Sequence, residues 1–76
     1  MEHVLRRIGK QGDVEHRWEV GLDDGRIHEA ERTFNKMLSN GGLAFGFDKP
    51  DDVGRQLDAF DPAVKEIVVF PRIAGG

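Results

Sequence analysis

The chain has 76 residues, of which 38% are hydrophobic and 33% charged, with a formal net charge of -3 and no cysteine. A chain of this length folds as one domain with one modest core, because it buries only about 60% of the surface that its unfolded form exposes. The mild negative charge disfavours a nucleic-acid-binding protein, and the lack of cysteine excludes a disulfide framework, a thiolate zinc site and a cysteine nucleophile. With no membrane-length apolar run and no signal-peptide pattern, we expect a cytoplasmic protein with no membrane partner.

The first twenty residues predict a β-hairpin. A strand is expected from His3 to Ile8, a glycine-containing turn over residues 9–12, and a return strand from Asp13 to Val20. The return strand has the two-residue period of a half-buried strand. One face would carry Val14, His16, Trp18 and Val20, and the other Glu15, Arg17 and Glu19.

The period then becomes that of a helix with one apolar stripe. The stripe consists of Ile27, Ala30, Phe34, Met37 and Leu38. Either Asp23 or Asp24 is expected to cap the N-terminus of this helix by accepting backbone N–H bonds. Gly41 and Gly42 are expected to end it, because glycine adopts the left-handed conformation cheaply.

Three further strands are expected after the helix. In the third, Leu43, Phe45 and Phe47 alternate with Ala44 and Gly46. A polar turn over residues 48–54 contains a proline and precedes a short fourth strand from Arg55 to Phe60. A turn at residues 61–62 leads to the last strand, Glu66 to Phe70, whose continuous apolar run is typical of a central strand.

This order predicts an α+β domain with a mixed four- or five-stranded sheet and one helix packed across it. The last strand would lie centrally and parallel to the first, which is the arrangement of the β-grasp fold. We therefore expect a β-grasp domain over residues 1–70 and a flexible diglycine tail over residues 71–76.

The sharpest motif is the C-terminal run Phe70-Pro71-Arg72-Ile73-Ala74-Gly75-Gly76. With the element order, this run resembles the ubiquitin-like superfamily. The end is similar to that of the bacterial sulfur carriers, namely the small subunit of molybdopterin synthase and the thiamine sulfur carrier. Arg72 matches a basic tail position by which the activating enzyme of ubiquitin selects its partner. The approach to the last strand lacks the Gly-Asp-Glu turn usual in the sulfur carriers, and residues 54–60 have no clear counterpart there, so the branch of the superfamily stays open.

The resemblance implies a protein modifier that is not itself an enzyme and holds no cofactor. An E1-like enzyme, which binds the ATP, would adenylate the Gly76 carboxylate; E2-like enzymes and JAB-type peptidases are the further partners that it implies, with target proteins as acceptors. Gly75 and Gly76 would form the activated end, and Arg72, Ile73 and Ala74 the part of the tail that the enzyme recognises. Glycines suit this chemistry, because a side chain would crowd the approach of the carboxylate to the α-phosphate.

Two other functions share this sequence pattern. A sulfur carrier would convert the same adenylate into a C-terminal thiocarboxylate and hand the sulfur to a sulfur-transfer enzyme during cofactor synthesis. A non-conjugated β-grasp module, like a domain of phage tail assembly proteins, would use the fold alone, and the glycines would be incidental.

Other candidate residues are weighed against ordinary structural roles. If Ile67 and Val69 point to the helix, Val68 and Phe70 lie on the open face of the sheet and could form a partner-docking patch. The histidines His3, His16 and His28 are expected to be packed or partly exposed side chains and not metal ligands. The acidic pairs Asp23/Asp24 and Asp51/Asp52 fall in predicted turns, where aspartate bonds neighbouring backbone N–H groups.

Overall fold

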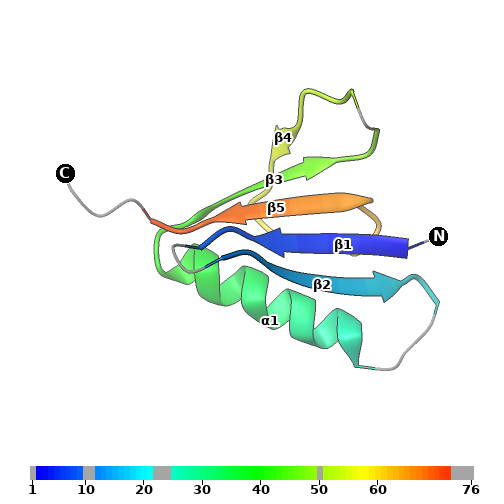
Figure 1. Ribbon diagram of the computed structural model, residues 1–76, viewed down its shortest axis with the longest axis horizontal. Helices are drawn as coiled ribbons and strands as arrows, with labels where there is room; N and C mark the ends of the chain where they lie inside the picture. The colour runs from blue at the N-terminus through cyan, green and yellow to red at the C-terminus, as the bar shows by residue number, and fades with distance from the viewer. Residues whose placement is uncertain (1, 10–11, 22–24, 50, 73–76) are drawn as a thin grey trace.

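The structure, a computed structural model, describes residues 2–9, 12–21, 25–49 and 51–72, which form one α+β unit of five strands and a single helix (Figure 1). In chain order the elements are β1 (Glu2–Arg7), β2 (Val14–Glu19), α1 (Arg26–Ser39), β3 (Leu43–Phe47), β4 (Arg55–Gln56) and β5 (Glu66–Phe70). The described part has no helix long and apolar enough to cross a membrane.

The sheet is mixed, with the strand order β2-β1-β5-β3-β4. β5 pairs in parallel with β1 and antiparallel with β3. The Ile8 N–H donates to the Val69 carbonyl over 2.9 Å, so the β1–β5 pairing continues to the ends of both strands. The prediction that the last strand is central and parallel to the first is therefore confirmed, and α1 lies across one face of this sheet (Figure 1).

The hairpin formed by β1 and β2 follows the predicted alternation. His3 lies opposite Trp18 and Leu5 opposite His16 in the antiparallel register. Trp18 is fully buried against the helix side of the sheet, as its place in the alternation predicts. The return strand ends at Glu19, one residue before the predicted end, and Val20 is 62% exposed.

Helix α1 packs through the predicted stripe. Ala30 and Phe34 are fully buried, and the other stripe residues are partly buried against the same core. The N-cap residue is Gly25, with a φ of 91°. The expected aspartate caps, Asp23 and Asp24, lie outside the described residues.

The third and fourth strands differ in how far they follow the sequence. In β3 the small residues Ala44 and Gly46 are the buried ones, so the large residues of this strand occupy the opposite face. β4 contains only Arg55 and Gln56, so the prediction of a strand reaching Phe60 is wrong for its second half. Phe60 instead packs against the core, because its ring finds aromatic partners there.

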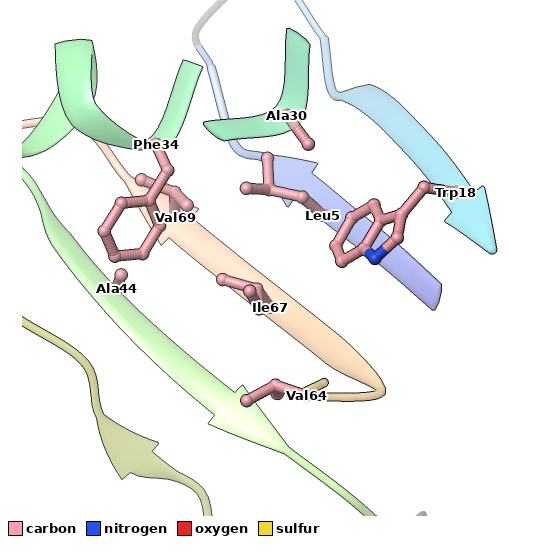
Figure 2. Close-up of a cluster of buried hydrophobic side chains, with 8 residues drawn as sticks. All are labelled: Leu5, Trp18, Ala30, Phe34, Ala44, Val64, Ile67 and Val69. Carbon is pink, nitrogen blue, oxygen red and sulfur yellow. The ribbon is translucent and has the colours of Figure 1, made fainter. Parts of the chain in front are cut away.

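The core lies between α1 and the sheet (Figure 2). The buried hydrophobic side chains are Leu5, Trp18, Ala30, Phe34, Ala44, Val64, Ile67 and Val69. Phe60 extends this cluster, with ring centroids 5.5 Å from Trp18 and 5.8 Å from Phe34. Every buried side-chain nitrogen or oxygen of the described residues has a hydrogen-bond partner, as is usual for a folded core.

Candidate functional site

The root of the predicted tail is placed by the end of β5. The strand ends at Phe70, and the exposed residues Pro71 and Arg72 lead the chain away from the sheet, at the same end of the molecule as the C-terminus of α1 (Figure 1). Arg72 is thus the one predicted tail-recognition residue that the structure places. The other predicted tail residues, Ile73, Ala74, Gly75 and Gly76, lie outside the described residues.

The C-terminus of α1 ends beside this tail root. The Gly42 N–H donates to the Met37 carbonyl over 2.8 Å and the Gly41 N–H to the Leu38 carbonyl over 3.0 Å, which together form a Schellman motif. Gly41 has a φ of 91°, the left-handed conformation expected of a glycine in this position. The predicted helix stop is therefore confirmed, and Gly41 is its left-handed residue.

Both glycines contact the end of β5 or the tail root directly. A Cβ atom at Gly42 would lie 2.5 Å from the Phe70 carbonyl oxygen, so only glycine allows the helix end to approach the strand this closely. A Cβ atom at Gly41 would lie 3.0 Å from Cδ of Arg72, because the aliphatic part of that side chain lies over Gly41. The Arg72 cation is therefore held at the C-terminal end of α1, the end that favours positive charge.

The open face of the sheet carries an apolar patch, which we define by its four residues, Leu43, Phe45, Val68 and Phe70. Ile67 and Val69 are fully buried on the helix side, so the orientation expected for Val68 and Phe70 is confirmed. In the β3–β5 register, Leu43 lies opposite Phe70 and Phe45 opposite Val68. The Phe45 and Phe70 rings meet edge to face, with centroids 6.0 Å apart.

Exposure distinguishes this open-face patch from an ordinary core layer. Leu43 is 49% exposed and Phe70 41% exposed, while Phe45 and Val68 are half-buried. Sequence reasoning missed Leu43 and Phe45, although the alternation of β3 beside β5 contained the signal. An apolar surface at the end of the sheet nearest the tail is suited to contact a protein that grips the tail.

The other half of the open face, formed by β1 and β2, is charged. Arg6 pairs with Glu15 at 3.1 Å and with Glu66 at 3.2 Å. Arg17 pairs with Glu2 at 2.8 Å and with Glu15 at 3.2 Å, and these acids raise the pKa of Arg17, chiefly through the hydrogen bond from Arg17 to Glu2. The apolar patch is therefore bounded on one side by paired charges, which are of low value for stability because they are exposed.

A second paired cluster lies in the β3–β4 loop. Asp48 accepts a hydrogen bond from Arg55 over 2.8 Å, and this bond holds the pKa of Asp48 below its ordinary value. Asp52 accepts the Asp48 backbone N–H over 3.1 Å, and that bond is the main cause of the lowered pKa of Asp52. The turn role expected of Asp52 is confirmed.

Two of the three histidines have structural partners. His3 is 6% exposed, donates through Nδ1 to the Val64 carbonyl over 2.8 Å and stacks on Trp18 with ring centroids 5.7 Å apart. Nε2 of His16 lies 3.2 Å from the Thr33 hydroxyl, between β2 and α1. Among the described residues, no three histidines, aspartates or glutamates are grouped so that they could hold a metal ion.

The comparisons with known proteins leave the site to be interpreted from its own geometry. No protein-family model, no curated protein and no solved structure matches this chain.

Proposed function

We propose that this chain is a β-grasp protein of the ubiquitin-like type that acts as a protein modifier. One observation carries the proposal: a central strand, β5, parallel to β1, leads straight into a chain end of sequence Pro71-Arg72-Ile73-Ala74-Gly75-Gly76. The confinement of α1 to one face supports the β-grasp assignment. The tail root lies beside an exposed apolar patch, which supports recognition by a second protein.

The proposed chemistry takes place at the Gly76 carboxylate. A carboxylate oxygen attacks the α-phosphorus of ATP held by an E1-like partner, forming an acyl-adenylate as pyrophosphate leaves. A cysteine thiolate of the partner then attacks the acyl carbon, and AMP leaves as the thioester forms. Finally an amine of a target protein displaces the thiolate, loses a proton and is joined to Gly76 through an amide bond.

The described residues contribute binding and orientation to this sequence. The open-face patch is proposed to dock on the E1-like or E2-like partner, because its four apolar side chains lie on the same sheet as the tail root. Arg72 is proposed to be read by the activating enzyme, and its contact with Gly41 fixes where the guanidinium starts from. Holding the tail root in one place raises the effective concentration of the carboxylate in the partner's site.

The experiment is an intact-mass measurement on the purified chain after incubation with ATP and an extract of its source cells. We expect ATP-dependent covalent adducts of the chain with other proteins. A chain that lacks Gly75 and Gly76, and is otherwise unchanged, should form none. Equal adduct formation by the two chains would contradict the proposal.

The same measurement separates the modifier from the sulfur carrier. Both begin with the adenylate of Gly76, but a carrier ends as a thiocarboxylate. A free chain that gains one sulfur in place of one oxygen, without adducts on other proteins, would replace the modifier by the carrier. If neither product forms, a module that works through its fold alone becomes the better account.

A further inference from the structure

A groove of about 520 Å³ opens at the tail end of the molecule, away from the open-face patch. It lies between the β1–β2 turn, the last turns of α1 and the start of the tail. Its apolar lining comes from Ile8, Val14, Met37 and Pro71. Val14 is 37% exposed and Pro71 is exposed, so these side chains are presented to a partner and are not part of the core.

The groove and the tail share one structural base. Pro71, the first residue after β5, is part of the groove wall. Met37, on the opposite wall, supplies the carbonyl that binds the Gly42 N–H, and Gly42 in turn packs against the Phe70 carbonyl. A protein that grips the tail at Arg72 therefore reaches the groove without moving along the sheet.

The charge at the groove is positive and uncompensated within the described part of the chain. Arg7 and Asp13 both line it, but no ion pair joins them. By contrast, Arg6 and Arg17 on the neighbouring positions of the hairpin each have two carboxylate partners. Arg7 and Arg72 have no ion pair with any described residue, so each guanidinium is available to a carboxylate of another molecule.

We infer that this groove binds an acidic segment of a protein partner, with one aliphatic side chain of that segment seated between Val14, Met37 and Pro71 and a carboxylate paired with Arg7. Charge complementarity decides the acidic character of the occupant, and the apolar lining decides the aliphatic anchor. The identification of that partner as the tail-activating enzyme rests on the proposed function. The groove itself is argued from its own residues.

The first test is an NMR titration of the full chain with the peptide acetyl-Glu-Asp-Leu-Asp-Glu-amide. We expect saturable shifts at Ile8, Val14 and Met37 with a Kd below about 1 mM, and no such shifts with a peptide in which serine replaces leucine. Arg7→Glu should weaken binding by about tenfold or more, because it turns an attraction into a repulsion. Arg32→Glu makes the same charge change on the exposed face of α1 and should leave binding unchanged.

Several outcomes would overturn the inference. These are no saturable shift, shifts centred on the open-face patch, or equal weakening by Arg7→Glu and Arg32→Glu. Binding that appears only after residues 73–76 are removed would assign the groove to the chain's own end. Association of the free chain through the groove, seen as a concentration-dependent mass in solution, would assign it to a second copy.

A kinetic test links the groove to the tail. In the ATP-dependent reaction, Arg7→Glu should raise the half-saturating concentration of the chain by about tenfold and leave the maximal rate unchanged, because binding is weakened and the tail is intact. Arg32→Glu should match the original chain. If the original chain reacts and both variants react equally, the groove is not used by the activating enzyme. If the original chain does not react, the proposed function fails, and the peptide titration still decides the groove.

Discussion

The two faces of the sheet use similar side chains for different ends. On the helix side, Phe34, Ile67 and Val69 are fully buried and form one continuous core. On the open side, Phe45, Val68 and Phe70 are also apolar, but no element of the described chain covers them, and Phe70 stays 41% exposed. Since β5 supplies residues to both faces, the same five residues hold the domain together and present the patch. Stability and partner binding should therefore separate cleanly between alternate positions of one strand.

The largest expected effect is on the helix side. Phe34→Ala should lower the free energy of unfolding by about 3–5 kcal/mol, because it leaves a cavity among Phe60, Val69 and Ala44 in a small core. Urea denaturation followed by circular dichroism measures this loss. A loss below about 1 kcal/mol would mean that α1 is not held by this stripe.

Gly42→Ala tests the contact that joins the helix end to the strand. Its Cβ would meet the Phe70 carbonyl oxygen at 2.5 Å and the Met37 carbonyl oxygen at 2.8 Å, so the backbone must shift. We expect a loss of about 1–3 kcal/mol, with amide shifts concentrated at Phe70 and Arg72. Ser39→Ala, an exposed change in the same helix turn, is the control and should be nearly neutral.

Phe70→Ser moves to the open face and sharpens the comparison. Because the ring is already 41% exposed, we expect a stability loss of only about 1–2 kcal/mol. ATP-dependent adduct formation should nevertheless fall several-fold, as it should for Leu43→Ser on the neighbouring strand. Val20→Ser, which removes an exposed apolar side chain away from the patch, should leave adduct formation unchanged. Unchanged adduct formation with Phe70→Ser would remove the patch from the proposed function.

The smallest effect is a pH effect in the β3–β4 loop. The pKa of Asp48 is lowered in the folded state, chiefly by its hydrogen bond with Arg55. Asp48 therefore stabilises the fold fully above its ordinary pKa of 3.8, and this contribution is lost as the pH falls through the lower pKa of the folded state. Asp48→Asn should flatten the acid side of the stability profile, while Asp51→Asn, an exposed neighbour, should not. Identical profiles for the two variants would contradict the assignment.

Much of this fold could be predicted from the sequence, because periodicity reports burial directly. The alternation around Trp18 and the stripe through Phe34 predict the hairpin and the helix, and the continuous apolar run of β5 predicts a central strand. The direction of the β3 alternation could not be predicted, since Phe45 would suit either face. The small residues Ala44 and Gly46 are the buried ones on the helix side of β3, while Phe34 and Phe60 supply bulk to the core.

The candidate site was predictable only where the chain itself marks it. The tail motif and the Val68/Phe70 pair follow from local sequence. Leu43 and Phe45 depend on which strand pairs with β5, and the groove depends on bringing Ile8, Met37 and Pro71 together from three distant segments. Strand pairing and helix docking set these contacts, and a local pattern does not report them.

The most direct test of the central claim uses a chemical trace left by the tail. Trypsin cleaves after Arg72, so any target joined to Gly76 would keep the remnant Ile-Ala-Gly-Gly on the modified amine. We expect peptide mass spectrometry of source-cell proteins to find this remnant on lysines, and to lose it when the chain is expressed without Gly75 and Gly76. Its absence from cells in which the intact chain is abundant would contradict the account.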